Sequence, residues 1–269
     1  LMNTNWLERM HAGLFSIPFG LFTLSGAWHR AVGFGWQVAA DVSSALLYFA
    51  TLVWVVLLVL YTAKCVRYHH SLLNEFMNPV QGALMALLPL SILMFVMIMG
   101  QPGADGWLAL ALFGLTLQFI IAARVVSLLA HGQMPEFTVT PALYLPPVTG
   151  GFLGGLAMAV VGYPGWGALL FGMGLAAWAL LEARVLNRLF HGPMPETLRP
   201  LIGIEMAPPA IATVAAGTIW PGIPGEVLIV GLGAMGLWHW RSGKLRPATM
   251  TGYDWLLLAA LAHFTVRCM

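Results

Sequence analysis

Charged side chains are scarce in this sequence. Only 8% of the 269 residues are Asp, Glu, Lys or Arg, whereas 59% are hydrophobic. A soluble domain has roughly 25% charged residues, so this composition excludes an ordinary soluble enzyme or binding domain. The sequence predicts an all-α integral membrane protein. Because no hydrophilic stretch is long enough for a second domain, residues 1–269 are expected to form one transmembrane domain.

Motifs for metal or catalytic chemistry are also missing. The two cysteines, Cys65 and Cys268, are far apart and belong to no CxxC pattern. The sequence has no HExxH spacing and no recognisable pair of nucleophile and base. We therefore expect no metal, no cofactor and no enzymatic activity, and an intramembrane enzyme is only a remote alternative. The net charge of +2 gives no indication of a nucleic-acid partner.

Long apolar runs are abundant. A helix needs about 20 mostly apolar residues to cross the hydrocarbon core. Eight segments satisfy this requirement: 11–29, 38–63, 80–99, 106–130, 141–161, 165–190, 200–219 and 223–240. A ninth run, 252–266, is short and carries Asp254 and His263, which the interior of a bilayer disfavours.

The basic residues orient these segments. If the spans alternate in direction, ten of the twelve Lys and Arg residues fall on one side, and only Arg30 and Arg267 fall on the other. The positive-inside rule then predicts a multi-pass protein with a cytoplasmic N-terminus. We expect the bacterial inner membrane as its location.

Prolines interrupt alternate segments. The first, third, fifth and seventh segments contain prolines within their apolar runs, whereas the second, fourth and sixth have none in their interiors; the prolines are Pro18, Pro89, Pro146, Pro147, Pro208 and Pro209. A proline inside a helix removes a backbone hydrogen bond, and lipid cannot replace that bond. The pattern predicts repeated helical hairpins, with an inner ring of proline-kinked helices surrounded by unbroken outer helices. For any one proline or glycine, ordinary helix packing remains the alternative.

The links into these segments repeat as well. YHHSLLNEFMNPV, HGQMPEFTVTP and HGPMPETLRP each place a histidine and a glutamate before a proline that can open the next helix. The period of roughly 60 residues indicates an internal repeat of a hairpin unit. We interpret His131 with Gly132, and His191 with Gly192, as helix C-terminal caps rather than metal or pH sites.

Five stretches carry a family resemblance: FSIPFGLFTLSGAW, NPVQGALMALLPLS, TPALYLPPVTGGF, VGYPGWGALLFGMGLAAWALLEARVL and LRPLIGIEMAPPA. On these residues the chain resembles the tellurite-resistance/dicarboxylate transporter family, the TehA-like proteins, which also include fungal malic acid carriers and plant guard-cell slow anion channels. The resemblance implies a homotrimer whose protomers each have ten helices in five hairpins. The five odd helices of each protomer would surround its own anion pathway.

The resemblance weakens toward the end of the sequence. The family's gate is a phenylalanine on the ninth helix, and Phe264 does not align with it. We therefore expect the C-terminal hairpin to be incomplete or divergent, and a nonconducting remnant remains an alternative.

Residues beside the predicted breaks are the candidate pathway residues. Phe19 and Phe152 are bulky enough to obstruct a pore that gates by dewetting, and Gly20 and Gly150 can open space next to them. The sequence thus predicts a channel or transporter for small inorganic or organic anions in a lipid bilayer.

Glu205 carries the main alternative. It is an ionisable residue within an apolar segment, which by default indicates a functional role. A carboxylate that takes up and releases a proton would suit a proton-coupled carrier of C4-dicarboxylates or tellurite. A position near the interface, with water or a basic neighbour as partner, explains Glu205 equally well.

Overall fold

The described part of the chain is entirely helical. A computed structural model describes residues 6–33, 35–36, 38–135, 138–190 and 195–222, and every regular element in these ranges is a helix. Six of the helices are long and apolar enough to cross a membrane. The predicted segments 223–240 and 252–266, and with them the C-terminal hairpin, lie outside the described residues.

The first and third predicted segments are composite, and the second is a single helix. A 3-10 turn, η1 (Ala12–Phe15), continues into α1 (Ser16–Val32). The second segment is the long α2 (Val38–Arg67), and the link after it contains a helix that the sequence did not predict, α3 (His69–Met77). The third segment is divided into α4 (Pro79–Leu84) and α5 (Leu87–Met99).

The remaining segments follow the same alternation. The continuous helices are α6 (Asp105–Ala130) and α8 (Pro164–Phe190). Between them, the fifth segment runs through η3 (Pro141–Tyr144) and a π-helical turn, η4 (Leu145–Thr149), into α7 (Gly150–Val160). The seventh segment begins as the 3-10 helix η5 (Glu196–Met206) and ends as α9 (Ala207–Ile219). Among the described residues, the second, fourth and sixth segments are therefore single helices. The first, fifth and seventh change helix type along their length, and the third is interrupted by a turn between α4 and α5.

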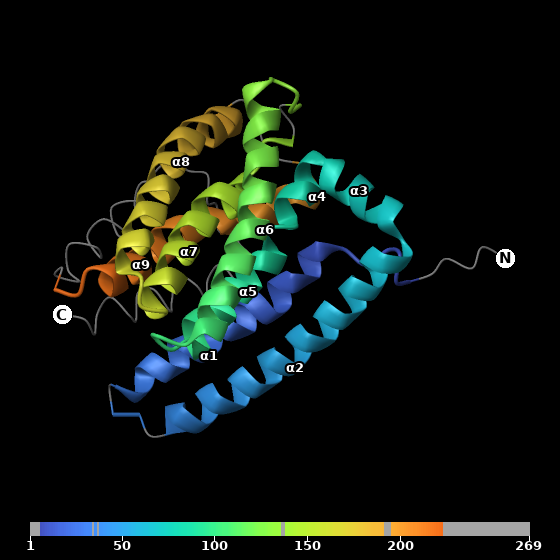
Figure 1. Cartoon of the computed structure of the whole chain (residues 1–269). Coiled ribbons are helices and arrows are strands. Elements are labelled where there is room, and N and C mark those ends of the chain that lie inside the picture. The colour runs from blue at the N-terminus through green and yellow to red at the C-terminus, as the bar shows by residue number, and fades with distance from the viewer. Residues whose placement is uncertain (1–5, 34, 37, 136–137, 191–194, 223–269) are drawn as a thin grey trace.

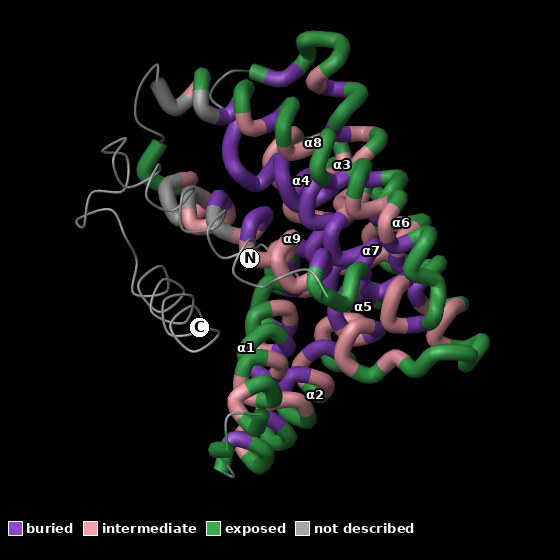
Figure 2. The backbone as a smooth tube through the Cα atoms, turned by 90° about the vertical axis from the view of Figure 1, so that its left-hand side faces the viewer, coloured by how far each residue is buried: buried purple, intermediate pink, exposed green. Residues whose placement is uncertain are grey.

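Burial separates the two kinds of segment. Buried residues make up 83% of the apolar stretch in Pro141–Val160 and 61% of that in Pro79–Met99. The corresponding share is 28% in Asp105–Ala130 and 17% in both Val38–Arg67 and Pro164–Val185, and it is 38% in Glu196–Ile219. Figure 2 shows buried backbone along α4, α5 and α7, with exposed backbone along much of α6. The third and fifth segments thus supply most of the interior, and the continuous helices face outward. The composite first segment is also largely exposed, since only Pro18, Phe22 and Ser25 of α1 are buried.

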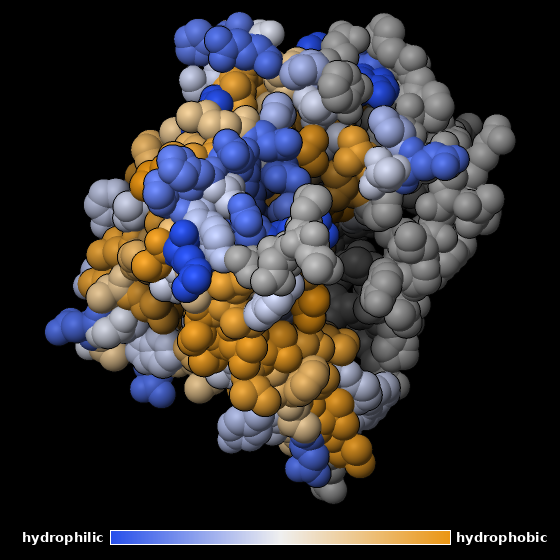
Figure 3. All heavy atoms as spheres, turned by 90° about the vertical axis from the view of Figure 1, so that its right-hand side faces the viewer, coloured by the Kyte–Doolittle hydropathy of each residue, from blue (hydrophilic) through white to orange (hydrophobic). Residues whose placement is uncertain are grey.

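The connections between consecutive segments lie at alternating ends of the molecule, as predicted for spans that alternate in direction. In Figure 1 the α1–α2, α5–α6 and α7–α8 connections lie at one end, and α3 and the link after α6 lie at the other. The face on the α3 side carries a cluster of hydrophilic side chains beside a broad apolar surface (Figure 3). This distribution is typical of a protein whose apolar girdle lies in lipid and whose polar end contacts water.

The predicted cap at the end of α6 is confirmed. Gly132 has φ +63°, in the left-handed region. The Gly132 N–H donates to Leu129 O, and the Gln133 N–H donates to Leu128 O, each over 3.1 Å. This pair of bonds is the Schellman pattern, which satisfies the last carbonyls of a helix. The matching Gly192 lies outside the described residues.

Glycines allow α7 and α8 to touch through their backbones. A Cβ added to Gly155 would lie 2.6 Å from Gly167 O, and one added to Gly151 would lie 2.6 Å from Gly174 Cα. Such contacts let two membrane helices pack without intervening side chains. The close approach fixes the buried α7 against the outer α8.

We expect Gly155→Ala to destabilise the protein by about 1–3 kcal/mol, because the new methyl group must displace the backbone of α8. Gly172 on α8 is the matched control, since an added Cβ there meets nothing within 4 Å. Gly172→Ala should be neutral or slightly stabilising. Thermal unfolding of both purified variants in detergent checks this, and equal melting temperatures would contradict it.

Candidate functional site

The prolines lie in the first turn after each break. Pro18, Pro89 and Pro209 each occupy the third position of an α-helix, in α1, α5 and α9 respectively. The first N–H groups of a helix have no intrahelical acceptor, so proline costs little there. The sequence placed these prolines inside kinked helices. The structure shows that the break comes just before the proline, as a change from 3-10 helix at α1 and α9 and as a turn at α5, and the proline lies in the first turn of the α-helix that follows.

The double proline of the fifth segment is accommodated differently. Pro146 and Pro147 lie within the π-turn η4, directly before α7. The side-chain amide of Gln118, from the middle of α6, donates to Leu145 O over 2.9 Å and to Pro146 O over 2.7 Å. Gln118 is only 3% exposed. An outer helix therefore supplies the hydrogen bonds that the π-turn needs.

Gly150 makes this arrangement possible. A Cβ added there would lie 2.4 Å from Gln118 Nε2. The glycine predicted as a pathway residue therefore provides room for the Gln118 amide. The sequence analysis missed Gln118. A single glutamine in an otherwise apolar helix was the available signal.

Other outer helices also send polar groups inward. The indole N–H of Trp54, on α2, donates to Ser91 Oγ over 2.9 Å, and Ser91 Oγ donates to Leu88 O next to Pro89. Near the start of α2, Ser43 exchanges side-chain to backbone hydrogen bonds with Ser25 of α1. Buried polar groups in a membrane protein must find partners within the protein. Here α2 supplies them to α1 and α5.

A tyrosine and two carboxylates meet where η3, α8 and η5 come together. Tyr144 is fully buried, and its hydroxyl donates to Glu182 Oε2 over 2.8 Å. Trp178 Nε1 donates to the same oxygen over 3.1 Å. Glu205 is 7% exposed and lies close enough to the Tyr144 hydroxyl to act on it electrostatically. The structure thus places Glu205 in the interior, beside a hydrogen-bonded pair that the sequence did not predict.

The two candidate phenylalanines occupy different environments. Phe152 is fully buried, with its ring centroid 5.0 Å from that of Phe171 and 6.2 Å from that of Trp178, both on α8. This position favours a role in joining α7 to α8. Phe19 on α1 is only partly buried, and the neighbouring Gly20 is exposed with nothing within 4 Å of an added Cβ. Open space at a break is therefore found beside Gly20.

The other candidate prolines are in the interior. Pro18, Pro89, Pro146, Pro208 and Pro209 are buried, and Pro147 is partly buried. Among the described residues, no group of three or more His, Cys, Asp or Glu side chains is arranged to hold a metal ion.

We predict that Gln118→Leu lowers the free energy of unfolding by about 1–3 kcal/mol, because it removes the amide donors from two buried carbonyls. Thr116→Val is the control on the same helix, since Thr116 is exposed and its hydroxyl bonds only to Leu112 O. Denaturation of the two variants in detergent measures the difference. Equal loss in both variants would show that the amide contributes little.

Comparison with curated proteins gives two relatives of different coverage. A stretch of 197 residues is 29% identical to the tellurite resistance protein TehA homolog of Haemophilus influenzae, covering 73% of this chain and 60% of the relative. A stretch of 204 residues is 26% identical to an uncharacterized transporter of Methanocaldococcus jannaschii, covering 66% of this chain and 56% of the relative. The matches span less than two thirds of either relative's length.

A family model extends the match over nearly the whole chain. The model described as voltage-dependent anion channel (SLAC1) matches residues 9–267. The match includes every composite helix and every continuous helix of the fold. It agrees with the resemblance inferred from the proline-containing stretches. The chain belongs to the voltage-dependent anion channel family.

Proposed function

We propose that this protein passes small inorganic or organic anions across a membrane, through a pathway between α1, α5, α7 and α9. The observation that carries the proposal is that these helices begin within the protein, each after a break at or just before its prolines. The chain runs in the same direction through all four helices (Figure 1), so their N-terminal ends point to the same side of the molecule. The membership of this chain in the voltage-dependent anion channel family supports the same function.

Helix N-termini provide the attraction for anions. The N-terminal end of a helix carries a partial positive charge, and half-helices in transporters direct such ends at anionic substrates. Selectivity can then come from pore width and backbone dipoles, without a lysine or arginine in the pathway. The charged Lys64 side chain within α2 does not contribute, since it is paired with Glu75.

The assembly and location are part of the same proposal. We propose a homotrimer in the bacterial inner membrane, with the N-terminus in the cytoplasm and one pathway within each protomer. The family resemblance supports the trimer. The distribution of Lys and Arg supports the orientation.

We predict that Gly20→Leu lowers anion flux severalfold, because it fills the open space beside the break in α1. An added Cβ at Gly20 meets nothing within 4 Å, so the fold should accept the change. Gly172→Leu is the control, since Gly172 is equally open but lies on the outer α8. Planar-bilayer currents with chloride, nitrate, sulfite, malate and tellurite measure the effect.

Two outcomes would contradict the proposed pathway. One is the absence of current for every anion with the purified full chain. The other is equal flux in the Gly20→Leu and Gly172→Leu variants, which would place the pathway elsewhere.

The position of Glu205 supports a second candidate function. Glu205 is buried beside Tyr144 and within the candidate span Glu196–Ile219. An ionisable residue within a membrane span is by default a candidate for a functional role such as proton relay. The alternative is a proton-coupled carrier of C4-dicarboxylates or tellurite. The name of the Haemophilus influenzae relative refers to tellurite resistance.

For a coupled carrier, Glu205→Gln should abolish malate or tellurite uptake driven by a pH gradient into proteoliposomes. Glu196→Gln is the control, because Glu196 lies on the same η5 helix but is exposed. Its uptake should match that of the wild type. A current at fixed potential with no accompanying proton flux would favour the passive pathway.

A further inference from the structure

A buried ion pair lies at the polar end of α2. Lys64 Nζ is 2.7 Å from Glu75 Oε2 on α3, and the two side chains are 1% and 3% exposed. Tyr61 donates its hydroxyl to the same carboxylate oxygen over 3.2 Å. The sequence analysis counted Lys64 among the loop charges that set orientation. Instead, its ammonium group is inside the protein.

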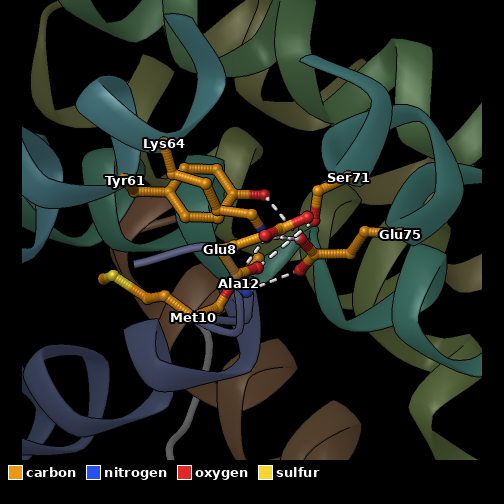
Figure 4. A network of polar contacts seen from close by, with 7 residues as sticks. All are labelled: Glu8, Met10, Ala12, Tyr61, Lys64, Ser71 and Glu75. Atoms are coloured by element: carbon orange, nitrogen blue, oxygen red, sulfur yellow. Dashed lines mark hydrogen bonds and ion pairs between the residues drawn. The ribbon is translucent and has the colours of Figure 1, made fainter. Parts of the chain in front are cut away.

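We define residues 6–12 as the N-terminal strap, and each partner of the pair holds the backbone of this strap. Lys64 Nζ donates to Met10 O over 2.5 Å. The N–H of Ala12, the first residue of η1, donates to Glu75 Oε1 over 2.6 Å. A third contact, from Ser71 Oγ to Glu8 O over 3.2 Å, lies nearby (Figure 4). Three side chains from α2 and α3 therefore hold the strap through its backbone.

The strap leads directly into the first broken helix. Ala12 begins η1, which continues without interruption into α1 and reaches Pro18. Phe15, at the end of η1, is fully buried and packs edge-on against Tyr61 with a centroid distance of 5.7 Å. A displacement of Ala12 would therefore move the break at the start of α1.

Stability alone does not account for the two charges. A buried ion pair can often be replaced by apolar residues of similar volume with no loss of stability, because burying the charges is costly. What the charges add here is direction, since an ammonium group can only donate and a carboxylate can only accept. These directions match a carbonyl at Met10 and an N–H at Ala12.

We propose that Lys64 and Glu75 are positioning residues, which fix the strap and so hold the first broken helix where anions can pass. The effect on flux rests on the proposed function. The attachment of the strap does not rest on it, and it can be measured separately.

Hydrogen exchange of the full chain in nanodiscs tests the attachment. In the Lys64→Met/Glu75→Leu variant, amides of residues 10–15 should exchange faster by on the order of tenfold, since charged hydrogen bonds to the strap are lost. Amides in the centre of α6 should keep their wild-type rates, because apolar replacements preserve the packing. Thr62→Val, at an exposed position of α2, is the matched control and should change neither region.

A charge swap distinguishes positioning from simple pairing. Lys64→Glu/Glu75→Lys keeps opposite charges together but presents a carboxylate to Met10 O and an ammonium group to the Ala12 N–H. We expect exchange in residues 10–15 to stay fast in the swap. Wild-type protection in the swap would overturn the proposal. Equal acceleration in α6 and the strap would also overturn it, since it would show a role in global stability only.

Anion flux in the same nanodisc-stable variants gives the second measurement. Flux should fall severalfold in the apolar double variant and in the swap, and should be unchanged in Thr62→Val. Released strap amides with wild-type flux would overturn the positioning role. If the wild type carries no anion current, the proposed function fails, and the exchange result still decides whether the strap is held by this pair.

Discussion

A broken helix within a bilayer needs hydrogen bonds that lipid cannot give, and the described fold depends on this constraint. Each freed carbonyl must meet a donor from the protein itself. The π-turn at Pro146 and Pro147 meets this requirement through Gln118. At the start of α5, the Ser91 hydroxyl donates to Leu88 O beside Pro89, and the Trp54 indole donates to Ser91 Oγ. The interior location of the third and fifth segments follows, because neighbouring helices can supply these groups there.

The constraint also explains how much of the fold could be predicted from the sequence. Proline placement alone identified which segments are composite, and these segments include the most buried ones. The Gly132 cap was predictable because its signal is local, a glycine after an apolar helix. By contrast, Gln118 lies 27 residues before the carbonyl of Leu145 that it contacts. No local pattern indicates which distant side chain will satisfy a given break.

The repeat in the links shows the same limit in another form. Glu75 and Glu196 occupy similar positions before a proline, so the sequence treats them as equivalent. In the structure Glu75 is buried against Lys64 and Ala12, whereas Glu196 lies exposed in the first turn of η5. Glu75 differs because the N-terminal strap of this chain reaches it. The repeated sequence predicts neither the backbone nor the partners of each link, since the first link forms the helix α3 whereas residues 131–135 of the second are turns and irregular backbone.

The proposed anion pathway raises an electrostatic question about buried carboxylates, and the structure shows how two of them are accommodated. The charge of Glu75 is balanced by Lys64. Glu182 lies on the outer helix α8, and the Tyr144 hydroxyl and the Trp178 indole both donate to one of its oxygens. Hydrogen bonds to a carboxylate disperse its charge and hold it in place. Glu205 is different, because it belongs to a composite helix itself. Under the proposed function, Glu205 thus lies among the helices assigned to the pathway, whereas Glu75 and Glu182 belong to α3 and α8.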